Sequence, residues 1–270
     1  MKIKILLSLV LVFLTAGVGA AQESTLSKGN VTQADADRII KKVTENEGAF
    51  RSALTQYVFN RNATIQIIGM GGQVTGQYRR DSFMSLLENG KRLEKILFFP
   101  VATTPPGFIT PEDLEDLGGV NPFALEPGSA PNYNFTYLGQ EHIDELDLLV
   151  FEVVPKVIPD PKKTSLRLFT GRIWVDDKDL MIVKSKGKGV PETKKNKFPI
   201  VETWRENIDG KYWFPSFASS DDELVFDNGS VTKIRIRIKF VDYRQGRTDV
   251  KILDEVEEPA PTPTPTPTKP

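Results

Sequence analysis

The sequence contains no cysteine and only one histidine, His142. Without thiols the chain can form neither a disulfide nor a thiolate metal site, and it lacks the cysteine that a lipoprotein signal requires after its cleavage point. A single imidazole leaves a zinc site short of ligands, and no Gly-x-Ser-x-Gly elbow accompanies His142 to form a catalytic triad. We therefore expect no metal, no cofactor and no enzyme activity.

An excess of charge of either sign is also lacking. The chain has 35 basic and 36 acidic residues, which gives a formal net charge of −1. Such a balance offers no general argument for a nucleic acid or an anionic membrane as partner. We expect no nucleic-acid partner, and we expect a monomer.

Long apolar runs are absent except at the start of the chain. The run from Ile5 to Leu14 is shorter than the ~20 residues that span a bilayer. Lys2 and Lys4 precede this run, and small residues follow it, as in a Sec-type signal peptide. We expect residues 1–21 to be removed after Ala20 or Ala21, with export to a bacterial periplasm; an uncleaved N-terminal anchor is the alternative.

Residues 255–270 end in "PAPTPTPTPTKP". Alternating proline and threonine cannot pack a core, so this segment is expected to be a disordered, solvated tail. It is either dispensable or a spacer towards a partner. The body of the chain, residues 32–254, is long enough for one large β domain or two small domains, and we expect one domain.

The body begins with a predicted helix. Thr32 and Asp35 resemble a capping box, and apolar residues follow at helical spacing up to Val58. Gly48 is expected to kink or divide this helix. After Phe59 the apolar period changes to two, which is typical of strands.

Ten or more strands follow with no crossover helix between them, which predicts an antiparallel meander. Gly71-Gly72, Asn89-Gly90, Asp209-Gly210 and Asn228-Gly229 mark tight turns between them. The strand-like runs are 63–69, 74–78, 83–88, 93–99, 133–138, 148–154, 166–175, 180–186, 200–207, 212–217, 223–226 and 231–243.

A proline-rich insertion, residues 100–131, interrupts the strands. Long insertions in compact β domains are usually lids, binding loops or disordered segments, and the apolar content here argues against disorder. A short helix is expected from Thr110, with proline at its first position. The expected lid residues are Phe108, Leu114, Leu117 and Phe123.

The run 231–243 alternates strictly between apolar and basic residues. Its apolar side chains are Ile234, Ile236, Ile238 and Phe240, and its basic ones are Lys233, Arg235, Arg237 and Lys239. A period of two places one face in an apolar interior and the other in water. The basic row is either an anion or headgroup site or a solvated face that discourages edge pairing, and we favour the solvated face.

The strands carry more apolar surface than one helix can cover. The run 166–175 is apolar on both faces, and further aromatic residues fall in strands. The sheet must either close over a filled core or stay partly open around an apolar cavity. The candidate cavity walls are Tyr133, Phe135, Tyr137, Trp174, Trp204, Trp213, Ile236 and Ile238.

Two acidic segments are weaker candidates for a site. The turn Asp176–Asp179 lacks the oxygen spacing, the glycine and the later glutamate of a calcium loop, so a simple hairpin turn explains it. The acidic run after Pro111 suits the start of a helix. A hydrolase that uses His142 or Asp113 remains a third hypothesis, because paired carboxylates can hydrolyse glycosides.

Two stretches resemble the LolA/LolB-type lipoprotein-carrier fold, which the sensor RseB shares. They are "GQYRRDSFMSLLENGKRLEKILF" (76–98) and "LFTGRIWVDDKDLMIVKSK" (168–186). The resemblance implies a mainly β (α+β) fold, a curved antiparallel half-barrel wrapped on the N-terminal helix, with a lid over an apolar cavity. It also implies a basic residue that helps to hold the lid closed, which is Arg79 or Arg80 here.

The sequence therefore predicts a periplasmic carrier or sensor that binds lipid acyl chains or a lipoprotein in an apolar cavity. The alternative is a non-enzymatic envelope module with a filled core, whose function is structural or lies in binding a protein partner. The two differ in whether the concave face of the sheet contains an accessible cavity.

Overall fold

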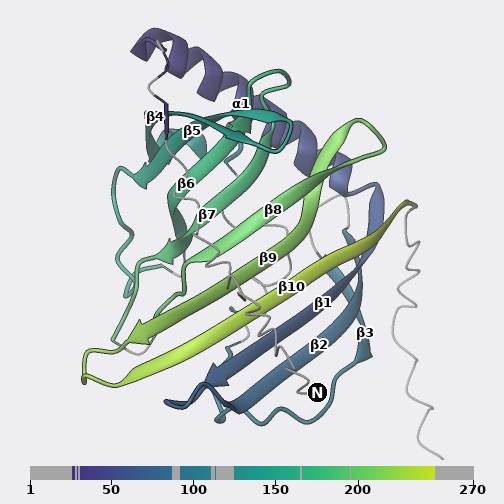
Figure 1. Cartoon of the computed structure of the whole chain (residues 1–270), viewed down its shortest axis with the longest axis vertical. Helices are drawn as coiled ribbons and strands as arrows, with labels where there is room; N and C mark the ends of the chain where they lie inside the picture. The colour runs from purple at the N-terminus through teal and green to yellow at the C-terminus, as the bar shows by residue number, and fades with distance from the viewer. Residues whose placement is uncertain are drawn as a thin grey trace, which may run out of the picture.

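The computed structural model describes residues 26–27, 29, 31–86, 92–110, 113, 125–164, 166–194 and 196–246. In this part of the chain one helix, α1 (Gln33–Leu54), lies against one ten-stranded sheet (Figure 1). A 3-10 turn, η1 (Ala130–Asn132), precedes β4. The strands are β1 (Tyr57–Ile68), β2 (Val74–Leu86), β3 (Arg92–Phe98), β4 (Tyr133–Ile143), β5 (Leu146–Pro155), β6 (Leu168–Asp176), β7 (Ile182–Val190), β8 (Val201–Ile208), β9 (Tyr212–Val225) and β10 (Val231–Gln245).

The sheet is an open antiparallel meander. Its order is β3-β2-β1-β10-β9-β8-β7-β6-β5-β4, so each strand pairs with its sequence neighbour except where β10 returns beside β1. β3 and β4 form the two edges and do not pair with each other. The predicted mainly β fold, a curved half-barrel on an N-terminal helix, is confirmed.

The helix begins where the capping residues place it. The Thr32 hydroxyl accepts a hydrogen bond from the Asp35 backbone N–H at 3.2 Å and donates one to the Asp35 carboxylate at 2.6 Å. The helix runs through Gly48 without division. A Cβ at Gly48 would lie 3.3 Å from the Pro127 ring, so the glycine allows a loop to approach the helix closely.

Helix α1 covers one part of the concave face of the sheet. Its first half packs through Ile40 and Val43 against β4, β5 and β6, and its last turns pack through Phe50 and Leu54 against β1 and β9. Figure 1 shows α1 running along one end of the sheet, next to the β6–β7 and β8–β9 turns. The concave surface nearer the opposite strand ends is left for other segments to cover.

β10 shows the predicted alternation. Ile234, Ile236, Ile238 and Phe240 are buried in the concave core. On the convex face Arg235 and Arg237 pair with Asp221 of β9, and Lys233 pairs with Glu223. The basic row is thus largely neutralised by carboxylates of the neighbouring strand, as expected for a solvated face.

Candidate functional site

A cavity of about 430 Å³ lies on the part of the concave face that α1 leaves uncovered. Its floor consists of alternate residues of neighbouring strands, because side chains two apart point to the same face. The floor is predominantly apolar, and its members are Ile65 on β1; Ile234, Ile236, Ile238 and Phe240 on β10; Ala218 and Leu224 on β9; and Val201 and Thr203 on β8.

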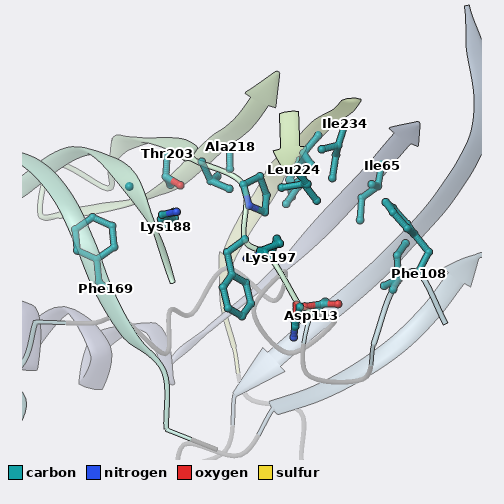
Figure 2. A pocket seen from close by; sticks show the side chains of 18 of the residues that line it. Ile65, Phe108, Asp113, Phe169, Lys188, Lys197, Thr203, Ala218, Leu224 and Ile234 are labelled. Atoms are coloured by element: carbon teal, nitrogen blue, oxygen red, sulfur yellow. The ribbon is translucent and has the colours of Figure 1, made fainter. Parts of the chain in front are cut away.

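Two loops form the roof of the cavity. One is the proline-rich segment Pro105–Ile109, and the other is Asn196–Pro199 between β7 and β8. Figure 2 shows strand residues such as Ile65 and Leu224 and loop residues such as Phe108 and Lys197 pointing into the same space. A ligand in this space would therefore contact both the sheet and the loops.

The first loop is anchored to β2. The Thr103 backbone N–H donates to the Gln77 carbonyl at 2.9 Å, and the Gln77 N–H donates to the Thr103 hydroxyl at 2.9 Å. A turn then follows, in which the Phe108 N–H bonds the Pro105 carbonyl. These bonds hold one end of the loop at the sheet and direct Phe108 over the concave face.

Arg167, which directly precedes β6, joins residues of the two loop regions through an ion pair and a ring contact. A carboxylate oxygen of Asp113 lies 3.7 Å from the guanidinium of Arg167, and that guanidinium lies 4.6 Å from the centre of the Phe198 ring. The Asp113 carboxylate also accepts the Thr110 N–H at 2.8 Å. Asp113 and Phe198 both line the cavity, so these contacts close one side of it.

Arg205 is the most deeply buried charged residue of the lining. Its guanidinium donates two hydrogen bonds to the Glu47 carboxylate of α1, at 2.6 and 3.0 Å. The side chains of Arg205 and Glu47 are 8% and 1% exposed. The guanidinium also stacks over Phe50 at 4.5 Å. This pair stabilises the junction of α1 with the sheet and leaves Arg205 with its charge already compensated.

The two lysines of the lining are also paired. Lys188 bonds Glu192 at 3.0 Å, and Lys197 bonds Asp227 at 2.9 Å. The hydrogen bond from Lys197, together with the charges of Lys197 and Lys194, lowers the pKa of Asp227 against the opposing effect of burial. Every charged side chain in the described lining therefore has an ion-pair partner, and an apolar ligand fits this environment best.

Three of the predicted site residues lie in the cavity lining: Ile236, Ile238 and the lid residue Phe108. The lid candidates Leu114, Leu117 and Phe123 fall outside the described residues. Tyr133, Phe135 and Tyr137 lie on the concave side of β4, where they pack with α1, β5 and β6 in the filled core and not in the cavity lining.

The three tryptophans also lie outside the lining. Trp174 packs with Leu148 and Val150 in a small cluster that is separate from the α1 core. Trp204 lies between the lining residues Thr203 and Arg205 on β8, so its side chain points to the opposite face of the strand. Both rings lie within 5 Å of the ammonium group of Lys184, at 4.7 and 4.3 Å. Trp213 donates to Asp179 at 2.7 Å. The second apolar face of β6 is thus covered by neighbouring side chains.

Arg79 and Arg80 point to opposite faces of β2. Arg79 is 47% exposed and bonds Asp81 at 2.7 Å, whereas Arg80 is 16% exposed and bonds Glu94 at 2.7 Å. Glu94 also accepts hydrogen bonds from Arg61 and Ser82. Of the two candidate basic residues, Arg80 is the one on the concave face.

Several lining residues were not predicted. Ala218 and Leu224 lie on β9, which the pattern divided into two runs, and the loop 196–199 carried no signal apart from its proline. Ile65 lies in the predicted run 63–69, and the same alternation that placed Ile236 could have identified it.

The other candidate sites have structural explanations. The Asp176 carboxylate accepts the N–H groups of Lys178 and Asp179, at 2.7 and 3.3 Å, and so caps its own turn. His142 bonds Asp147 at 2.8 Å at the surface. In the described residues no three His, Asp or Glu side chains are grouped as a metal site would require, and no described helix is both long and apolar enough to cross a bilayer.

No family model matches this chain, and no curated protein sequence matches it. Among solved structures, a DUF1329 family protein from Desulfovibrio piger matches with 14% identity and a TM-score of 0.41 over 80% of this chain and 95% of its own.

Two matching structures contain MucB. The Pseudomonas aeruginosa MucA/MucB complex matches with 9% identity and a TM-score of 0.24 over 79% of this chain and 100% of its own. A structure of MucB matches with 11% identity and a TM-score of 0.27 over 77% of this chain and 94% of its own. At such low identities and TM-scores, neither a family nor a function of this chain follows from these matches.

Proposed function

We propose that the chain binds an apolar ligand, such as a lipid acyl chain or the acyl chains of a lipoprotein, in the cavity beneath the two loops. The observation that carries this proposal is the uncovered apolar floor of β1, β8, β9 and β10, roofed by Pro105–Ile109 and Asn196–Pro199. A cavity of about 430 Å³ lies in the usual range for small-molecule sites.

The driving force would be burial of apolar ligand surface, at ~25 cal/mol per Å². The ion pairs of Arg205, Lys188, Lys197 and Asp113 support this assignment, because none of these charges needs a ligand to compensate it. The hydroxyls of Ser185 and Thr203 and the side-chain amide of Asn196 are neutral polar groups in the lining that could orient one end of a ligand.

The proposed setting is the bacterial periplasm, with residues 1–21 as a cleaved signal peptide and 255–270 as a solvated tail. In that compartment a non-enzymatic carrier or sensor could hold an acyl chain away from water. The lid would be the insertion 100–131, with Phe108 in contact with the ligand. An envelope module with a filled core is the competing function, and it predicts no ligand binding.

The proposal can be tested by titrating purified protein with a fluorescent fatty acid and displacing it with an unlabelled one. Ala218 is 4% exposed and lies on the cavity floor, so Ala218→Trp should fill the space and abolish binding. Leu224→Ala, which enlarges the same space, should retain binding with an altered preference for chain length.

Leu148→Ala is the matched control, because Leu148 is fully buried in the separate cluster around Trp174. This variant should lose stability by roughly 2–5 kcal/mol but bind the fatty acid as the wild type does. If the wild type binds no fatty acid, or if Ala218→Trp binds it as well as Leu148→Ala does, the proposed function is wrong.

A further inference from the structure

The two ends of the sheet differ in their chemistry. In an antiparallel meander successive connections alternate between ends. The connections 69–73, 99–109, 156–167, 191–200 and 226–230 meet at one end, here called the distal rim. The turns 144–145, 177–181 and 209–211 meet at the other, beside α1. Figure 1 shows the two ends at the lower left and the upper right of the sheet.

Large apolar side chains are exposed on the distal rim. Met70 and Val101 are almost fully exposed, at 107% and 92%, and Val157, Ile158 and Leu166 are 76%, 60% and 53% exposed. They come from three different connections, so the rim is apolar along much of its length. Exposed apolar surface of this extent usually marks a site of interaction.

The turns beside α1 are acidic instead. The β6–β7 turn binds its own backbone through Asp176 and Asp179, and the β8–β9 turn holds Asp209 against Tyr57 at 2.9 Å. In these turns carboxylates outnumber lysines: Asp144, Glu145, Asp177, Asp179 and Asp209 stand against Lys178 and Lys211.

Basic residues accompany the apolar ones on the distal rim. The β5–β6 loop carries Lys156, Lys162 and Lys163 beside Val157 and Ile158. Lys163 lies 3.9 Å from Asp160, while Lys156 and Lys162 have no ion pair with any described residue. One loop therefore presents exposed apolar side chains together with uncompensated positive charge, the combination that binds the surface of an anionic bilayer.

We propose that the distal rim docks onto an anionic lipid bilayer. Val157, Ile158 and Leu166 would enter the headgroup region, while Lys156 and Lys162 would contact lipid phosphates. The cavity lies near the same end, because its roof loops Pro105–Ile109 and Asn196–Pro199 belong to the distal rim. Docking would thus bring the cavity next to the membrane. The docking itself would depend only on residues of the distal rim and would not require a ligand in the cavity.

The test is cosedimentation of the full mature chain with vesicles of phosphatidylcholine, with or without phosphatidylglycerol. Wild-type protein should bind the vesicles that contain phosphatidylglycerol, and added salt should weaken this binding. Reversing two charges, Lys156→Glu with Lys162→Glu, should lower the affinity by about tenfold or more. Removing two apolar side chains, Val157→Ser with Ile158→Ser, should also reduce it.

Matched controls lie away from the rim. Lys178→Glu changes an exposed lysine in the opposite turns, and Val241→Ser changes a valine that is 37% exposed on β10. Both should bind vesicles normally. Ala218→Trp should also bind them, and the rim variants should still bind fluorescent fatty acid, which separates docking from occupancy of the cavity.

The proposal is overturned if wild-type protein does not sediment with the anionic vesicles, or if Lys178→Glu reduces sedimentation as strongly as the rim variants do. It is also overturned if the rim variants instead disrupt a dimer seen by analytical ultracentrifugation while vesicle binding is absent. The rim would then be a contact between two copies of the chain.

Discussion

At the scale of single residues, the most consequential contact near the cavity is the ion pair of Arg205 with Glu47. Burial of both side chains makes each charge dependent on the other, because both are largely removed from solvent. The pair also links α1 to β8, so it positions the helix beside the cavity. In an exposed ion pair such as that of Lys42 with Glu45, each charge stays hydrated and does not need the other for its stability.

Glu47→Gln should therefore lower the free energy of unfolding by roughly 3–5 kcal/mol, since it leaves the Arg205 charge buried and unpaired. Urea denaturation measures this loss. Glu45→Gln, at an exposed position of the same helix, should change stability by less than about 1 kcal/mol. Equal effects of the two substitutions would contradict the role assigned to the buried pair.

Glu202 predicts a dependence of stability on pH. Burial alone would raise its pKa, but the hydrogen bond from Trp204 and the charges of Lys184 and Lys186 outweigh burial and lower the pKa below the usual 4.5. The carboxylate therefore stabilises the fold above pH 4.5, and this contribution is lost as the pH falls through the lowered pKa.

The melting temperature of the wild type should accordingly exceed that of Glu202→Gln at neutral pH, and the difference should shrink below pH 4.5. Glu145→Gln, in the exposed β4–β5 turn, serves as the comparison and should show little difference at any pH. If the difference in melting temperature between wild type and Glu202→Gln stays constant as the pH falls, the ionised carboxylate of Glu202 does not cause that difference.

At the scale of elements, β6 and β7 approach closely at a pair of glycines. Gly187 lies opposite Gly171 in the ladder, and the Phe169 ring covers them. A Cβ at Gly187 would lie 2.3 Å from the Thr170 carbonyl oxygen and 2.5 Å from the Phe169 ring. Because one of these neighbours is backbone, the strands would have to separate.

Gly187→Ala should consequently destabilise the protein by roughly 1–3 kcal/mol, as overpacking generally does. Gly128→Ala is the control, because a Cβ there would meet nothing within 4 Å. Thermal unfolding of the two variants compares them directly. A Gly187→Ala variant as stable as Gly128→Ala would show that the strands adjust without cost.

The sequence predicted the type of most elements but not always their extent. Period two identified the strands, and Thr32 with Asp35 identified the start of the helix. β9 was divided into two runs, and the run of β2 was expected to resume only at Phe83, because polar residues such as Asp221 and Asp81 interrupt the apolar pattern. In the sheet these polar residues pair with arginines on the convex face and so continue the strand.

At the scale of the whole molecule, the excess of apolar strand surface correctly indicated that one helix could not cover the sheet. Which strands stay uncovered was not predictable, because it depends on where α1 crosses the concave face. Tyr133 and Phe135 were expected at the cavity but pack beneath α1, whereas Ala218 was too small to stand out.

The distribution of charge was also hidden in the sequence. A net charge of −1 gave no argument for an anionic membrane, yet lysines predominate in the β5–β6 loop at one end of the sheet and carboxylates predominate in the turns at the other. This distribution depends on which loops lie at the same end of the sheet, and the order and direction of the strands decide that. The amino-acid composition gives only the total charge of both ends together, so it cannot show the difference between them.

The central claim is that the uncovered concave surface holds an apolar ligand. Native mass spectrometry of the protein purified from the cell envelope tests this most directly, with Ala218→Trp prepared in parallel. We predict that the wild type carries an adduct that organic extraction identifies as a lipid, and that the variant carries none. A wild-type protein that shows only the mass of its polypeptide, or an adduct that persists unchanged in Ala218→Trp, would contradict the claim.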